Sequence, residues 1–200
     1  MSYPRAKRAL DIFGALLGLV AIAPLAPLII LAIRLETPGP GVVKLPRMSG
    51  GRVVAVYKFR SMVDRARERK AGLAHLNERT DGPFFKIAND PRLTRVGRII
   101  RRFRLDEFPQ LWNVLRGDLA LVGPRPHEED EVRRYPDGYA HIAMARAGVT
   151  GLSQVSGASS LPFLKELELD SYYLEHQSLW LDFTILARTA AILFFDPTAV

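Results

Sequence analysis

The sequence contains no cysteine and only four histidines, and these two shortages restrict the sites that the protein can build. Without cysteine there are no disulfides and no thiolate-bound metal. The four histidines are scattered and include no HExxH pair, so a histidine-based zinc site is not expected. The sequence also shows no internal repeat and no low-complexity tract. A repeat architecture and a disulfide-stabilised fold are therefore excluded.

The 200 residues suit one domain with a modest core. The net charge of +7 and the pI near 10.0 favour an anionic partner. That partner could be nucleic acid, a phospholipid head group or a phosphorylated substrate. Fourteen prolines indicate many turns and argue against a simple helical bundle.

An apolar stretch near the N-terminus, Ile12 to Ile33, contains no charged residue. As a straight helix rising ~1.5 Å per residue, it would match a hydrocarbon core of ~30 Å. A signal peptide is a poor interpretation, because no small-residue cleavage site leads into a plausible secreted domain. On hydropathy alone, the simplest interpretation is a transmembrane anchor.

Pro24 and Pro27, in the middle of this stretch, favour a different topology. Each removes a backbone donor and crowds the preceding turn, so the helix should break or kink there. Cations flank both ends, and both ends then prefer the cytoplasmic side. A kinked hairpin that enters and leaves the membrane on one face satisfies both facts, if its freed carbonyls are satisfied locally. We expect Asp11 to stay at the interface near Lys7 or Arg8.

The middle of the chain begins with two predicted strands, Val42 to Leu45 and Val53 to Phe59, joined around a glycine pair. The second strand runs into Lys58 and Arg60, which the period of two places on one side. Two cations at a strand end can grip a phosphate, and the alternative is that they are solvated edge charges. A charge-rich helix is predicted to start in the segment 64–70 and to fade into a loop by residue 81.

Thr94 is a plausible N-cap for the next helix. Apolar residues of this helix recur at the spacing of one stripe, and arginines surround them. Such a helix can lie in a bilayer interface with its arginines reaching the head groups. The alternative is a helix that covers the core with a basic outer face. The stripe comprises Val96, Ile99, Ile100 and Phe103, and the arginines are Arg95, Arg98, Arg101, Arg102 and Arg104.

Two adjacent carboxylates, Asp106 and Glu107, follow this basic segment. One interpretation is structural: Asp106 caps a helix that Gly117 ends, and Glu107 complements its dipole. The other is catalytic, because a helix N-terminus and nearby arginines favour an ionised Asp106. An ionised aspartate can attack phosphorus and form an acyl phosphate. Two carboxylates also suit Mg²⁺, which binds one or two of them together with substrate phosphate oxygens.

Pro124, Arg125 and Pro126 follow an apolar run, 119–122, that resembles a strand. The two prolines restrict the backbone around Arg125, and a rigidly presented guanidinium suits a phosphate or a base. Further along, Asp170 and Asp182 are either orienting groups for active-site arginines or surface and capping carboxylates.

Taken in order, these motifs resemble the bacterial sugar transferases, the monotopic phosphoglycosyl transferases, from about Arg5 to about Arg188. The motifs that carry the resemblance are the Pro24-broken apolar segment, Pro38-Gly39-Pro40, Lys58-Phe59-Arg60-Ser61-Met62, Asn89-Asp90-Pro91-Arg92, Leu105-Asp106-Glu107, Asn113-Val114-Leu115-Arg116-Gly117-Asp118, Val122-Gly123-Pro124-Arg125-Pro126 and Gly148-Val149-Thr150-Gly151.

The resemblance implies transfer of a phospho-sugar from a UDP-sugar to a polyprenol phosphate, usually undecaprenyl phosphate, with release of UMP. It implies that Asp106 is the nucleophile, that Glu107 places Mg²⁺ or handles a proton, and that the reaction starts glycan assembly at the cytoplasmic face of the bacterial inner membrane. The implied site has Asp106 and Glu107 as catalytic residues and Mg²⁺ ligands, with substrate contacts from Lys58, Arg60, Arg102, Pro124, Arg125, Pro126, Asp170 and Asp182.

Three positions depart from the family pattern. Ala23 stands where a serine often precedes the kink proline, and the stretch 44–47 contains an unexpected Pro46. Ala158 stands where an arginine is expected to contact substrate phosphate, so that role is not carried over. Arg146 is one candidate to replace it.

We therefore expect an α+β fold with a re-entrant membrane helix in residues 1–36, both termini cytoplasmic, and a catalytic domain in residues 37–200. That domain combines interfacial amphipathic helices with a small core and a short sheet. Phospholipid is an expected partner and nucleic acid is not, while a homodimer remains open, as do the sugar, the exact lipid and the glycan pathway. Two rivals stay open: a transferase that uses a ternary complex without a covalent intermediate, and a membrane-anchored basic module that binds anionic lipid or nucleic acid.

Overall fold

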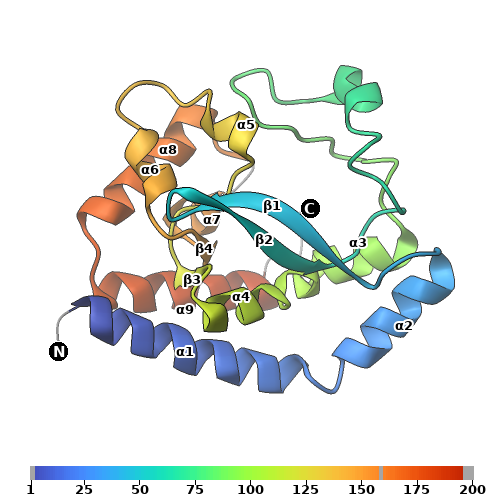
Figure 1. The fold of residues 1–200 in the computed structure, drawn as a ribbon, viewed down its shortest axis with the longest axis horizontal. Helices are drawn as coiled ribbons and strands as arrows, with labels where there is room; N and C mark the ends of the chain where they lie inside the picture. The colour runs from blue at the N-terminus through green and yellow to red at the C-terminus, as the bar shows by residue number, and fades with distance from the viewer. Residues whose placement is uncertain (1–2, 158–159, 196–200) are drawn as a thin grey trace.

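The computed structural model describes residues 3–157 and 160–195, which form a mixed α+β fold (Figure 1). The elements, in chain order, are α1 (Tyr3–Ile22), α2 (Ala26–Glu36), β1 (Val42–Ser49), β2 (Arg52–Phe59), η1 (Ala71–Leu76), α3 (Arg95–Arg102), η2 (Leu105–Glu107), α4 (Gln110–Arg116), β3 (Ala120–Val122), α5 (Glu129–Val132), α6 (Ala140–Met144), β4 (Gly148–Thr150), α7 (Leu152–Val155), α8 (Phe163–Glu175) and α9 (Leu179–Phe195).

The N-terminal apolar segment is broken into α1 and α2, which meet at an angle of 60°. The break falls at residues 23–25, and Pro27 then occupies the first turn of α2, where its missing N–H costs nothing. The predicted kink is thereby confirmed. In residues 3–157 and 160–195, no single helix is long and apolar enough to cross a membrane, whereas α1 and α2 together reach that length and composition. The re-entrant membrane placement stays a prediction.

Buried charges hold α1 against the rest of the protein. Asp11 lies beside Lys7, as predicted, and is fully buried in the protein, where one of its oxygens accepts a 2.9 Å hydrogen bond from the Leu121 backbone N–H. The ammonium of Lys7 lies 3.1 Å from Asp11 and 3.3 Å from Asp182 of α9. Arg8 donates to the carbonyl oxygen of Val114 in α4 at 2.7 Å. Helix α1 is therefore pinned to α4, β3 and α9, beneath which it runs in Figure 1.

The hairpin β1–β2 is antiparallel, with Val42 opposite Phe59 and Ser49 opposite Arg52. Gly50 and Gly51 form its two-residue turn with φ values of +61° and +72°, as a type I′ turn requires. The predicted hairpin is confirmed, and both strands are longer than expected. Pro46 is accommodated because β1 is an edge strand of a two-stranded sheet, where one side pairs with no other described strand. A second, parallel pair joins β3 to β4, with Ala120 opposite Gly148.

The segment 64–70 does not start an α-helix, contrary to the sequence-based prediction. It forms turns and leads into the 3-10 helix η1. Arg65 has a φ of +53°, which a right-handed helix cannot contain, so the charged run is broken near its beginning. The charged composition of residues 64–70 favoured a helix, but the left-handed backbone of Arg65 is incompatible with one.

Two apolar clusters flank the turn between α3 and α4. The larger includes Val56, Val114 and Val122, together with Ile185 of α9. The smaller gathers Ile22, Ile33, Phe59 and Ile100 at the bend of α1 and α2. Because both clusters reach the α3–α4 turn through Phe108, this turn is held firmly on either side.

Candidate active site

The Asp-Glu pair lies in η2, a short 3-10 turn between α3 and α4. Helix α3 begins at the predicted cap, where the Thr94 hydroxyl accepts a hydrogen bond from the Gly97 N–H at 2.8 Å. Arg104 then adopts a left-handed conformation with a φ of +50°, which ends the helical path and starts a new turn. The predicted stop of α4 at Gly117 is confirmed, with a φ of +83°.

The prediction that Asp106 caps α4 is wrong, because Pro109 occupies the N-cap position. Asp106 is instead 6 % exposed and is packed in the interior. A carboxylate in this position is not used to start a helix and is free to take part in chemistry.

Lys58 of β2 brings a positive charge to both carboxylates. Its ammonium lies 2.6 Å from Oε1 of Glu107 and 4.0 Å from Oδ2 of Asp106. The strand is fixed at this level by the fully buried Asn113 of α4, which accepts from the Tyr57 N–H and donates to the Ala55 carbonyl. Lys58 was expected either to grip a phosphate or to be a solvated edge charge, and the structure places its ammonium beside the two carboxylates of the dyad.

The two carboxylates of the dyad have opposite pKa shifts. Burial raises the pKa of Asp106, and the charge of Lys58 only partly opposes this while the charge of Glu107 adds to it. Burial alone would also raise the pKa of Glu107, but Lys58 and Arg125 outweigh it and hold that pKa below its usual value. We expected the environment to favour an ionised Asp106; the burial that sequence spacing does not reveal reverses that direction. The environment therefore separates two chemically equal groups into different roles.

The arginine of α3 that influences Asp106 is Arg101, not Arg102. The charge of Arg101 acts to lower the pKa of Asp106, and its guanidinium donates to Ser61 Oγ at 2.9 Å. Arg102 is exposed and its guanidinium lies 6.0 Å from the ring centre of Phe103. The sequence shows Arg101 only as one of several arginines in this segment. Because Arg104 is left-handed, the helical spacing of α3 does not continue to the dyad and cannot tell which arginine faces it.

Arg60 does not share the side of Lys58. Its buried guanidinium donates to the carbonyl oxygens of Pro38 at 2.6 Å and Thr37 at 2.7 Å, next to the end of α2. Strand β2 ends at Phe59, so the alternation of side chains does not extend to Arg60. In this structure Arg60 joins the α1–α2 helix pair to the hairpin.

Arg125 enters the site from the loop after β3. Its backbone N–H donates to Oδ2 of the fully buried Asp170 at 3.1 Å. The loop is tied down further because the Pro124 carbonyl accepts from the Gly148 N–H at 2.8 Å. The charge of Arg125 lowers the pKa of Glu107 and that of His127. Pro124, Arg125 and Pro126 thus form a fixed loop next to the dyad.

Asp170 and Asp182 lie in different surroundings. Burial raises the pKa of Asp170 to about 6, although Ser153 and the Arg125 backbone act to lower it. Asp182 is fully buried, accepts a 2.7 Å hydrogen bond from the Tyr173 hydroxyl and lies 3.3 Å from Lys7. Asp170 therefore supports the Arg125 loop, whereas Asp182 belongs to the group that holds α1.

His127 was not singled out from the sequence as a site residue. Its ring stacks on Phe84 at 4.2 Å between centres, and its Nδ1 contacts the Tyr135 hydroxyl. Burial, and then the charge of Arg125, lower its pKa well below the usual value, so the imidazole is neutral. The signal in the sequence that could have pointed to His127 is its position directly after Pro126.

Ala158, which stands where the family pattern has an arginine, lies outside the described residues.

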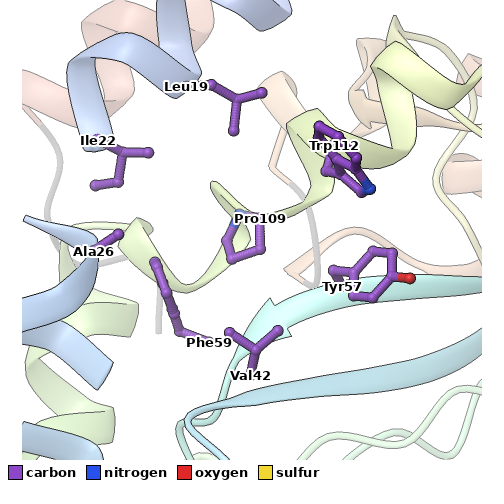
Figure 2. A pocket seen from close by; sticks show the side chains of 8 residues that line it. All are labelled: Leu19, Ile22, Ala26, Val42, Tyr57, Phe59, Pro109 and Trp112. Carbon is purple, nitrogen blue, oxygen red and sulfur yellow. The ribbon is translucent and has the colours of Figure 1, made fainter. Parts of the chain in front are cut away.

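An open apolar groove of about 260 Å³ adjoins the dyad turn (Figure 2). It lies between the α1–α2 bend, the end of β2 and the start of α4. Pro109, three residues after Asp106 along the chain, forms part of the groove wall. The residues that line it are Leu19, Ile22, Ala26, Val42, Tyr57, Phe59, Pro109 and Trp112.

Among the residues that the structure describes, no group of three or more His, Cys, Asp or Glu side chains is placed to hold a metal ion. The dyad supplies two adjacent carboxylates, the number that Mg²⁺ uses when phosphate oxygens and water complete its shell. Asp106 and Glu107 are chemically suited to Mg²⁺ bound together with a phosphorylated substrate, and this metal stays a prediction.

Comparison with known proteins gives a consistent result. The chain is 40 % identical over 191 residues to the "Undecaprenyl-phosphate galactose phosphotransferase" of Salmonella typhimurium, covering 93 % of this chain and 40 % of that protein. It is 40 % identical over 205 residues to the "UDP-glucose:undecaprenyl-phosphate glucose-1-phosphate transferase" of Caulobacter vibrioides, covering 96 % and 71 %. It is 32 % identical over 188 residues to the "Exopolysaccharide production protein ExoY" of Rhizobium meliloti, covering 92 % and 83 %.

The chain spans only about two fifths of the length of the first of these relatives. The family model described as "Bacterial sugar transferase" nevertheless matches residues 2–196, which is almost the whole chain. The segment that matches includes α1, the dyad turn and the Arg125 loop. The protein therefore belongs to the bacterial sugar transferase family.

Proposed function

We propose that the protein transfers a phospho-sugar from a UDP-sugar to a polyprenol phosphate such as undecaprenyl phosphate, through a covalent intermediate on Asp106. The observation that carries this proposal is the buried Asp106 beside Lys58 and Glu107, in a chain whose relatives bear the names of undecaprenyl-phosphate sugar phosphotransferases. The charges of Lys58 and Arg101 act on this carboxylate, and such cations would also stabilise the negative charge of a diphosphate under attack.

In the first step, an oxygen of the Asp106 carboxylate attacks the phosphorus that carries the sugar. The bond from that phosphorus to the bridging oxygen breaks, and UMP leaves with the electron pair. In the second step, an oxygen of the polyprenol phosphate attacks the same phosphorus, and the acyl–phosphate bond breaks. Asp106 recovers its carboxylate, and the product is a polyprenyl diphospho-sugar.

The surrounding residues have separate tasks in this scheme. Lys58 and Arg101 lie where negative charge increases during attack, and Arg125 adds a cation from the opposite loop. Glu107, kept ionised by Lys58, orients that ammonium and supplies a second carboxylate. Mg²⁺ bound by Asp106 and Glu107 would neutralise charge on the diphosphate.

The surface of α1 and α2 supports a site at the bacterial inner membrane, on its cytoplasmic face, with both termini on that side. Exposed apolar side chains recur at helical spacing on each helix and form one stripe on α1 and one on α2. Two interfacial features accompany them: Phe103 at the end of α3 and Trp180 of α9, which is 81 % exposed. The stripes comprise Phe13, Leu17 and Val20 on α1, and Leu28, Leu31 and Leu35 on α2.

The decisive experiment separates the half-reactions. Protein purified in detergent with Mg²⁺ is incubated with UDP-glucose, UDP-galactose or UDP-N-acetylgalactosamine and without lipid. Intact mass spectrometry should show one added phospho-sugar, with an equimolar burst of UMP. Asp106→Asn should show neither. A ternary-complex mechanism predicts UMP only after polyprenol phosphate is added, and a basic binding module predicts no UMP at all. Either result would refute the covalent scheme.

A further inference from the structure

The apolar groove at the α1–α2 bend exists because the apolar segment is bent. A straight helix presents a convex surface, whereas a bend of 60° at residues 23–25 leaves a concave inner side. Leu19 and Ile22 line that side from α1, and Ala26 lines it from α2 (Figure 2). The outer side of the same bend carries exposed residues such as Val20 and Leu28. One bend thus has an outer apolar surface and an inner apolar groove.

The groove continues to the dyad turn. Tyr57 and Phe59 of β2 point into it, and Lys58 between them points to the opposite face, where it meets Glu107. Pro109, which follows soon after the dyad turn, lines the groove as well. The turn that carries Asp106 therefore separates a charged compartment from an apolar one.

From this arrangement we propose that the groove binds the isoprene units of the lipid acceptor nearest its phosphate. The proposal rests on the proposed function and adds a binding site to it. Because the lining consists of aliphatic and aromatic side chains with few hydrogen-bonding groups, it suits a hydrocarbon chain better than a nucleotide or a sugar. An apolar cavity of about 150 Å³ binds benzene, so the groove has room for roughly one or two isoprene units. The rest of the tail stays in the bilayer.

The same arrangement gives each substrate its own side of Asp106. The soluble donor reaches the dyad from the side of Lys58 and Arg125, and the lipid reaches it along the bend. Trp112, exposed at the rim, covers part of the incoming chain. A lipid that enters in this way passes from the bilayer to the turn without exposing its first units to water.

The test uses two alanines of the bend, three residues apart. Ala26→Trp fills the groove, whereas Ala23→Trp adds the same bulk at an exposed position outside it. Each variant is first loaded with UDP-sugar, which measures the lipid-independent UMP burst, and is then mixed with undecaprenyl phosphate. We expect both variants to keep the burst. Ala26→Trp should raise the KM for the lipid roughly tenfold, which corresponds to the loss of burial of about two methylene groups.

A second pair of variants changes residues outside the α1–α2 bend, so its result does not depend on whether the first pair alters the fold of the bend. Trp112→Ala opens the rim at an exposed position, and Tyr172→Ala removes an exposed aromatic side chain of α8 outside the groove. Trp112→Ala should raise the KM for the lipid while Tyr172→Ala leaves it unchanged. If both Ala26→Trp and Trp112→Ala transfer the phospho-sugar to undecaprenyl phosphate with the parental KM, the proposal is overturned. The groove would then hold a phospholipid chain or no chain. Failure of the proposed function itself would be distinct, because the parent protein would then show no UMP burst.

Discussion

The ammonium of Lys58 lies 2.6 Å from Oε1 of Glu107, and this contact separates the roles of the two dyad carboxylates. Glu107 is held in its ionised form by the nearest charge. Asp106, with the same ammonium at 4.0 Å, is governed by its burial and has a raised pKa. One lysine on β2 thus controls the protonation of both groups on the dyad turn.

Replacing Lys58 by methionine should slow formation of the covalent intermediate by about 10²- to 10³-fold, as for loss of one charge-stabilising group. The pKa of Asp106 should rise further, because the cation that lowers it is gone. The acidic limb of the pH–rate profile for UMP release should therefore move to higher pH. Lys165→Met, which removes an exposed lysine of α8, is the control. An unmoved acidic limb in Lys58→Met would argue against this electrostatic coupling.

Replacing Gly97 by alanine should destabilise the protein and impair catalysis together. An added Cβ would lie 1.8 Å from the Ser61 carbonyl oxygen, a backbone atom that cannot move aside alone. Overpacking of this kind costs about 1–3 kcal/mol. Since α3 leads directly into the dyad turn, its displacement should also lower the UMP burst rate. Gly72→Ala is the matched control, because a Cβ there meets nothing within 4 Å. Equal melting temperatures for the two variants would show that α3 is not packed as described.

Asp170 should make stability fall as the pH rises from about 4 to about 6. Its pKa in the folded protein is raised to about 6, above the ordinary value of 3.8, so the folded state binds the proton more tightly than the unfolded state. Unfolding then releases a proton over this pH range, and ionisation at higher pH costs roughly 3 kcal/mol. Asp170→Asn keeps an acceptor for the Arg125 N–H and removes the titration. Its melting temperature should exceed that of the parent above pH 6 and approach it near pH 4. A constant difference across this pH range would exclude Asp170 as the source.

Lys7→Met should loosen α1 from the core, because it leaves Asp11 and Asp182 buried without the cation between them. Removing one partner of a buried ion pair typically costs about 3–5 kcal/mol. Arg5→Met changes an exposed cation of the same helix and should have little effect. Thermal unfolding in detergent measures the difference, and limited proteolysis shows whether α1 is released first. Identical unfolding of both variants would mean that the cluster does not hold the helix.

Several features could be predicted from the sequence because local chemistry specifies them. The bend follows from prolines that cannot donate a backbone hydrogen bond, the hairpin from a glycine pair that accepts positive φ, and the start of α3 from the hydroxyl of Thr94. The order of motifs also identified the family correctly.

Other features depend on contacts that spacing does not encode. Lys58 and Arg60 are two residues apart and were expected on one side, yet the strand ends between them and only Lys58 reaches the dyad. The choice of Arg101 over Arg102 depends on the left-handed residue that follows α3.

The sequence by itself determined the bend, the hairpin, the Thr94 cap, the Gly117 stop and the presence of an Asp-Glu pair among arginines, because each needs only neighbouring residues. Only the tertiary structure decided that Asp106 is buried, that Lys58 lies closer to Glu107, and that the bend encloses a groove beside Pro109. Exclusion of water, which sets the pKa of Asp106, arises when segments far apart in the chain pack together, and no local pattern specifies it.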